Sequence, residues 1–76
     1  MQSRGVSLSA GQRVRHWREL KNVSQLDLAE RAKMDNARLC RIENGKTKAR
    51  AEEIERLAAA LELSMAEFYG DEARAS

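Results

Sequence analysis

Apolar residues recur at the spacing of helical turns through most of this chain. Ile54, Leu57, Ala58 and Leu61 form an i, i+3, i+4, i+7 stripe, which is typical of the buried face of a helix. Shorter apolar groups come earlier: Val14 with Trp17; Leu28, Ala29 and Ala32; and Leu39 with Ile42. No segment alternates apolar and polar residues over more than a few positions, as a half-buried strand would. The pattern predicts an all-α fold.

Capping signals divide this pattern into helices. Three serines precede a Gln, Asp or Glu by three residues, which is the spacing of a capping box: Ser9, Ser24 and Ser64. Asp35 can cap a helix that begins at residue 36, and Gly45 suits the left-handed position that follows a helix. These signals predict five helices, at residues 10–21, 25–32, 36–44, 50–61 and 65–72.

The expected organisation is a single small domain. We expect residues 9–72 to form it, with a flexible N-terminal segment at 1–8 and a flexible tail at 73–76. A chain of 76 residues buries only a small core, so a further source of stability is expected, and oligomerisation is the simplest one.

Several functional classes can be set aside from the sequence. The single cysteine, Cys40, excludes an internal disulfide, and together with the single histidine it is too little for a zinc site. Because we find no phosphate-binding glycine loop, metal cluster or nucleophile–base arrangement, we expect no cofactor and no enzymatic activity. No apolar run reaches the length of a signal peptide or a membrane span, so we expect a cytoplasmic protein without a membrane partner.

The charges are distributed unevenly along the chain, although the formal net charge is only +2. Residues 1–32 contain six basic and three acidic side chains, and residues 33–51 contain six and two. Residues 52–76 contain two basic and seven acidic side chains. This asymmetry is compatible with a basic face for a polyanion, although a solvated surface of mixed sign explains the charges equally well.

Two short predicted helices with a tight connection span Ser24 to Asn44. The connection is only residues 32–35. This is the layout of a helix-turn-helix, whose second helix enters the DNA major groove. A short helical hairpin can also be plain scaffold, so the layout alone leaves both interpretations open.

Three segments in register resemble the Cro/phage-repressor family, also called XRE-like helix-turn-helix proteins. The segments are SQLDLAERA at 24–32, LCRIENGKTK at 39–48 and IERLAAALELS at 54–64. The resemblance extends from about residue 10 to about residue 70. It implies a compact, five-helix, lambda-repressor-like domain that binds double-stranded DNA through its major groove.

The resemblance also implies roles for individual residues. Four positions on the second helix of the motif would face base edges: Asn36, Ala37, Arg38 and Arg41. Arginine can bond guanine in a fork and asparagine can do so with adenine, although either arginine could instead hold a phosphate. Other positions would contact the DNA backbone: Gln25, Asn44, Lys46, Thr47, Lys48, Arg50 and Arg18.

The resemblance also implies a structural ion pair, and the chain departs from the family pattern at two positions. Arg18 is expected to pair with Glu43 and so fix the angle between two helices, with Lys46 and Arg15 as the alternative partners of Glu43. Lys33 stands where the family usually has glycine, and Ala49 stands where it often has proline, which affects turn geometry. Cys40 lies within the recognition helix, where a packing role is favoured over a redox sensor.

The expected function is transcription regulation by a homodimer on a palindromic operator, most simply repression of its own promoter. One module contacts too few bases to select a site in a genome, and two copies double the contacts. The acidic C-terminal part would be repelled by DNA, so its apolar residues are expected to form the two-fold contact: Leu61, Leu63, Met65, Phe68 and Tyr69. The alternative is an antitoxin-like or co-regulator module that binds a partner protein, and a protease is a further conceivable partner. The operator sequence, and repression against activation, stay open.

Overall fold

Five helices make up the part of the chain that the structure, a computed structural model, describes, which is residues 8–70. Most of the predicted flexible segment 1–8 and the whole predicted tail 73–76 lie outside these residues. The helices are α1 (Ala10–Leu20), α2 (Gln25–Arg31), α3 (Asn36–Glu43), α4 (Ala51–Ala60) and α5 (Met65–Phe68). The all-α prediction is confirmed, and α1 to α4 begin and end within one residue of the predicted bounds. α5 ends at Phe68, short of the prediction.

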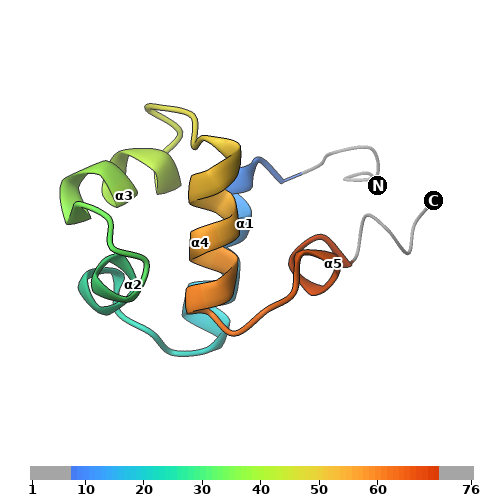
Figure 1. Ribbon diagram of the computed structural model, residues 1–76. Helices are drawn as coiled ribbons and strands as arrows, with labels where there is room; N and C mark the ends of the chain where they lie inside the picture. The colour runs from blue at the N-terminus through green and yellow to red at the C-terminus, as the bar shows by residue number, and fades with distance from the viewer. Residues whose placement is uncertain (1–7, 71–76) are drawn as a thin grey trace.

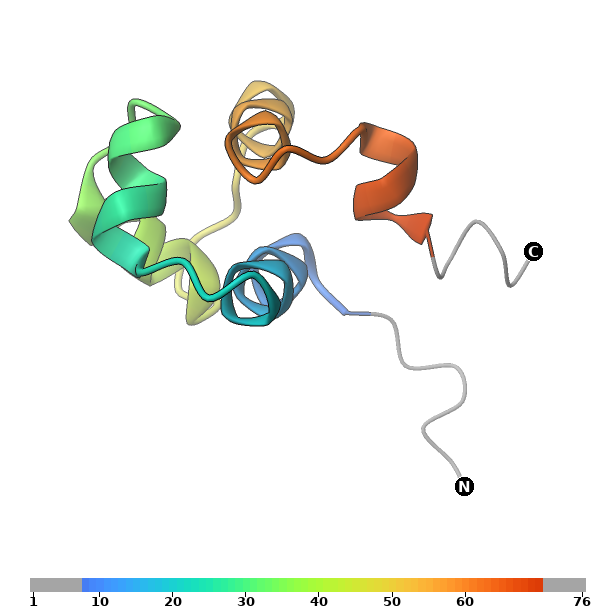
Figure 2. The same cartoon turned by 90° about the horizontal axis from the view of Figure 1, so that it is seen from below.

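The helices are arranged around a central pair (Figure 1). α1 packs against α4 in the middle of the molecule. α2 and α3 lie together on one side of this pair, and α5 lies on the other side, as Figure 2 shows. α3 packs against α1 and α2, whereas its direct packing against α4 is slight. The two helices of the predicted motif therefore share one side of the molecule, and α5 lies far from them.

A single hydrophobic core lies between these helices. Its largest fully buried side chains come from all five helices and the turn after α4: Val14, Leu28, Leu39, Ile42, Leu57, Leu61 and Phe68. Each contributes about 1.5–3 kcal/mol to folding by its removal from water. Trp17 and Ile54 are partly buried and pack against this core.

Serine caps begin three of the helices, as the sequence predicts. The Ser9 hydroxyl accepts from the Gln12 N–H at 3.1 Å, and the Gln12 side chain accepts from the Ser9 N–H at 2.9 Å. Ser24 and Ser64 each accept from the N–H three residues later, at 3.0 Å. Asp35 occupies the N-cap position of α3, but its carboxylate makes no cap hydrogen bond. The predicted Asp35 cap is therefore right in position and wrong in its hydrogen bond.

α1 to α4 all end in the same way, with one residue in the left-handed region. The φ angles are 61° at Asn22, 56° at Lys33, 77° at Gly45 and 63° at Glu62. In each turn the next residue donates its N–H to the carbonyl five residues earlier, at 2.8–2.9 Å, which is a Schellman motif. Only one of the four positions is glycine, so the other three each carry roughly 1 kcal/mol of backbone strain.

α1 approaches α3 most closely at Gly11. A Cβ atom at this position would lie 2.0 Å from the carbonyl oxygen of Ile42. Only glycine permits α1 and α3 to approach so closely here, because every other residue carries a Cβ. Gly11 therefore sets how near the C-terminal end of α3 lies to α1.

Candidate nucleic-acid interface

α3 has one face in the core and one face in solvent. Its buried side chains are Leu39, Ile42 and Glu43. The exposed side chains at its surface and its C-cap include four that the resemblance assigns to DNA: Asn36, Ala37, Arg41 and Asn44. Amide, methyl and guanidinium groups of this kind can bond or contact base edges in a major groove. The outer face of α3 therefore has the chemistry that base reading requires.

A bidentate ion pair holds the C-terminal end of α3. Arg18 on α1 donates from Nε and Nη2 to the two carboxylate oxygens of Glu43, at 2.8 and 3.0 Å. Gln25, at the start of α2, donates its side-chain amide to the same carboxylate at 3.2 Å. The Glu43 side chain is only 2% exposed, and its hydrogen bond with Arg18 raises the arginine pKa above its ordinary value. Three helices therefore meet at one buried carboxylate.

Arg18 makes the predicted ion pair with Glu43, and its remaining guanidinium hydrogen bond is also within the chain. Its third guanidinium nitrogen, Nη1, donates to the carbonyl oxygen of Val23 at 3.0 Å. The side chain is 13% exposed. All three nitrogens have acceptors within the chain, and the contact of Arg18 with the DNA backbone stays a prediction.

A second bidentate ion pair holds the N-terminal half of α3. Arg38 donates from Nε and Nη2 to the two carboxylate oxygens of Glu53, at 2.6 and 2.8 Å. Glu53 lies on α4 and also accepts from the Arg50 N–H at 2.8 Å. Arg38 Nη2 is 3.4 Å from the carbonyl oxygen of Lys48. The pKa of Glu53 is lowered to about 2, and the hydrogen bonds from Arg38 are the main cause.

The base-reading role predicted for Arg38 would compete with this ion pair. The guanidinium fork of Arg38 is already occupied by the carboxylate of Glu53, whose side chain is 5% exposed. The same fork would be needed for O6 and N7 of guanine. Arg41 is exposed and is the arginine of α3 that remains for a base contact. Glu53 was not among the predicted site residues, although an acid three residues after an N-cap is a recognisable signal.

The loop between α3 and α4 carries most of the predicted phosphate contacts. Four of these residues are exposed, namely Asn44, Lys46, Lys48 and Arg50, and Thr47 is half-buried. Three cations therefore lie on one short stretch that follows directly from the outer face of α3. A basic loop in this place can neutralise phosphates, which positions a protein on DNA without reading its sequence.

Cys40 is half-buried and lies one turn before Asn44 on α3. Its sulfur is 3.4 Å from the side-chain amide nitrogen of Asn44, which donates a weak hydrogen bond to it. This contact orients the Asn44 side chain at the edge of the exposed face.

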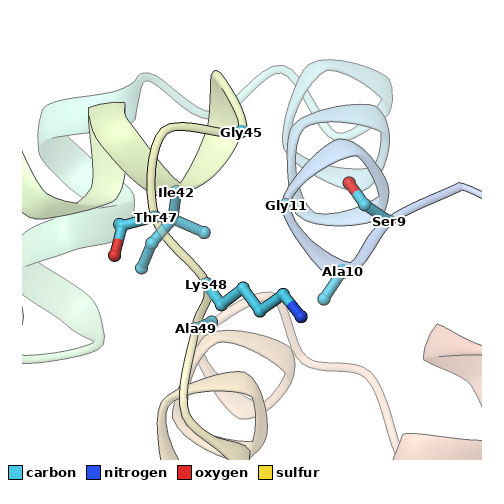
Figure 3. A pocket seen from close by; sticks show the side chains of 8 residues that line it. All are labelled: Ser9, Ala10, Gly11, Ile42, Gly45, Thr47, Lys48 and Ala49. Carbon is cyan, nitrogen blue, oxygen red and sulfur yellow. The ribbon is translucent and has the colours of Figure 1, made fainter.

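A hollow of about 310 Å³ lies between the loop that joins α3 to α4 and the start of α1 (Figure 3). Its lining is Ser9, Ala10, Gly11, Ile42, Gly45, Thr47, Lys48 and Ala49. The Lys48 side chain extends across the hollow toward Ala10, the first residue of α1. An ammonium group and the positive end of a helix dipole therefore lie on the same side of the molecule, and both attract anions.

Two members of the predicted dimer contact are not on the surface. Leu61 and Phe68 are 1% and 0% exposed because they fill the core of their own chain. The Phe68 carbonyl accepts from Arg13 Nη1 at 3.4 Å and from Trp17 Nε1 at 3.2 Å, which ties α5 to α1. These two side chains are therefore not available to a second copy. The other three are half-buried or exposed: Leu63, Tyr69 and Met65.

Two further findings concern only residues 8–70. No group of three His, Cys, Asp or Glu side chains lies together there as a metal site would need. None of the helices in this described part combines the length and the apolar character needed to cross a bilayer.

The chain was compared with protein families, with curated proteins and with solved structures. The model of a helix-turn-helix family matches residues 14–68, which is most of the chain and includes α2, α3 and the loop that follows. No curated protein and no solved structure matched the chain. The match runs from within α1 to the end of α5, so it includes the outer face of α3 and the basic loop. The chain therefore belongs to the Cro/C1-type, XRE-like helix-turn-helix family of DNA-binding transcription regulators.

Proposed function

We propose that this protein is a repressor that binds a palindromic operator as a homodimer, with its own promoter as the first candidate target. The observation that carries this proposal is the division of α3 into two faces. The inner face is held by the core and by two bidentate ion pairs. The outer face offers Asn36, Ala37 and Arg41 to solvent, beside a basic loop. Helix-turn-helix proteins read a major groove with exposed residues of their second helix.

The proposed base contacts come from the outer face of α3. Arg41 can donate two hydrogen bonds to O6 and N7 of guanine. Asn36 can bond adenine in the same bidentate way, and Ala37 can touch a thymine methyl. Arg38 is omitted from this set because Glu53 already binds its guanidinium.

The proposed backbone contacts flank that helix. Gln25 lies at the N-terminus of α2, where free N–H groups attract a phosphate, and its hydrogen bond to Glu43 fixes its orientation. The loop after α3 supplies the remaining contacts: Asn44, Lys46, Thr47, Lys48 and Arg50. These contacts would give affinity that falls steeply with salt concentration.

The proposed dimer uses the side of the molecule that carries α5. Met65 is 37% exposed, and Leu63 and Tyr69 are half-buried beside it. α5 lies across the central helix pair from α3, so a contact there leaves the reading helix of each copy unobstructed (Figure 2). We take residues 9–72 as the domain that forms this assembly.

The test is binding to the duplex upstream of the gene against a scrambled duplex, by fluorescence anisotropy at two salt concentrations. We expect a preference of about a hundredfold or more for the upstream duplex. Arg41→Ala should remove that preference. Arg31→Ala is the matched control, because Arg31 is exposed and lies beside the C-terminal end of α4 rather than on the outer face of α3.

Equal and strongly salt-dependent binding to both duplexes would contradict this proposal at that promoter. Selection of duplexes from a random pool then decides whether another operator exists. A pool from which the protein enriches no sequence would contradict sequence-specific regulation altogether.

A further inference from the structure

The charged residues of α3 that form its ion pairs oppose the dipole of the helix. Arg38 lies in the first turn, where the free N–H groups favour acidic residues. Glu43 is the last residue, where the free carbonyls favour basic residues. Neither side chain therefore stabilises α3 by itself. Each one stabilises the contact of α3 with another element, and the two contacts lie at opposite ends of the helix.

The contact at Glu53 connects parts of the fold that otherwise have little contact. Direct packing between α3 and α4 is slight. The Glu53 carboxylate accepts from Arg38 on α3 and from the Arg50 N–H at the end of the loop. Arg38 also reaches the carbonyl oxygen of Lys48 within the loop. We name these four residues, Arg38, Lys48, Arg50 and Glu53, the Glu53 junction.

We propose that the Glu53 junction determines how strictly the protein discriminates between DNA sequences, without touching a base. The inference rests on the proposed function. Bases are read by α3, while the register on the duplex comes from phosphate contacts of the loop. The junction is the hydrogen-bonded link between these two parts. Arg38 and Glu53 are then positioning residues, and Arg41 is the residue whose reading they align.

This inference differs measurably from direct base reading by Arg38. If Arg38 read one base, its loss would relax selectivity at one base pair of each half-site, and loss of Glu53 would free the arginine for that base. If the junction aligns α3 with the loop, loss of either partner relaxes several base pairs together. Nonspecific binding and its dependence on salt would be kept, because the cations of the loop stay exposed.

The experiment compares Glu53→Gln with the matched control Glu55→Gln, which makes the same substitution at an exposed position of the same helix. The operator is first selected from a random duplex pool with the wild-type protein. Dissociation constants are then measured for that operator, for each single base-pair variant and for a scrambled duplex, at two salt concentrations. For Glu53→Gln we expect the preference for operator over scrambled duplex to fall about tenfold or more, spread over several base pairs. Glu55→Gln should match the wild type.

A second variant, Arg38→Lys, keeps the charge but loses the fork, and should relax several base pairs in the same way. Circular dichroism establishes whether each variant is folded. If Glu53→Gln does not fold, the result for Arg38→Lys tests the inference in its place. Wild-type selectivity in a folded Glu53→Gln, or relaxation at a single base pair in Arg38→Lys, overturns the inference. A wild-type protein that selects no operator overturns the proposed function instead.

Discussion

Glu53 gives this protein a dependence of stability on pH that can be worked out from the structure. Its carboxylate is buried and accepts hydrogen bonds from Arg38 and from the Arg50 N–H, which lower its pKa from an ordinary value of 4.5 to about 2. Because each pKa unit corresponds to about 1.36 kcal/mol, the full effect at neutral pH is roughly 3 kcal/mol. The Arg38 side chain is 26% exposed, so solvent screening reduces the expected value to about 2 kcal/mol.

The sign of the effect follows from proton binding. Between about pH 2 and pH 4.5 the unfolded chain binds a proton at Glu53 more readily than the folded chain does, so stability rises with pH in this window. The contribution is complete above pH 4.5 and is lost as the pH falls through that window. More than half of it should be gone by about pH 3. Glu53→Gln removes this titration, so the variant should be less stable than the wild type at pH 7 by about 2 kcal/mol.

The assay is urea denaturation at a series of pH values from 3 to 7, followed by the fluorescence of Trp17. This is the single tryptophan of the chain, and its indole donates to the Phe68 carbonyl, so its emission reports unfolding of the core. The difference in free energy of unfolding between wild type and Glu53→Gln should shrink as the pH falls. Glu55→Gln, on the exposed side of α4, should show no such trend. A difference that is the same at pH 3 and pH 7 would refute the reasoning.

Three other predictions test the fold around the site. Gly11→Ala should lower the free energy of unfolding by about 3 kcal/mol, because its Cβ would meet the Ile42 carbonyl at 2.0 Å. Gly70→Ala, with open space around it, should change little. Equal urea midpoints for the two variants would contradict this prediction. Glu62→Gly should raise the free energy of unfolding by about 1 kcal/mol, because φ is 63° there, and Gly45→Ala, at φ 77°, should lower it by a similar amount. Both changes can be measured by calorimetry. If Glu62→Gly were less stable than the wild type, Glu62 would carry no backbone strain. Phe68→Asp should abolish folding, because the Phe68 side chain is fully buried. Met65→Glu should stay folded and sediment as a monomer. A dimeric Met65→Glu protein would exclude the proposed dimer contact.

The helices and their caps were predictable because their causes are local. A serine and the residue three positions later interact wherever the helix lies in the fold, so Ser9, Ser24 and Ser64 could be assigned without tertiary information. The turn at Lys33 was also foreseen, since glycine is usual there. The left-handed turns at Asn22 and Glu62 were missed: asparagine adopts this conformation more readily than most residues, so Asn22 carried a local signal, whereas glutamate carries none.

The contacts that the sequence did not predict depend on how elements far apart in the chain pack together. Arg38 and Glu53 are fifteen positions apart, and only the fold brings them together. The resemblance therefore assigned Arg38 to DNA by its place on the helix. Leu61 and Phe68 were assigned to a dimer because the C-terminal segment has many apolar residues. Composition does not distinguish a surface contact from a helix that closes its own core, and these two side chains do the latter.

The way in which α3 is supported explains how so short a helix can present a reading surface. Eight residues are too few for a stable isolated helix, and Arg38 and Glu43 each lie at the end of α3 where the helix dipole disfavours their charge. Its position therefore comes from Leu39 and Ile42 in the core and from the two arginine–glutamate pairs near its ends. Since these structural contacts use the inner face and Arg38, the outer residues have no structural contact to lose. Substitutions at Asn36, Ala37 and Arg41 should then change which sequence is bound without changing the fold.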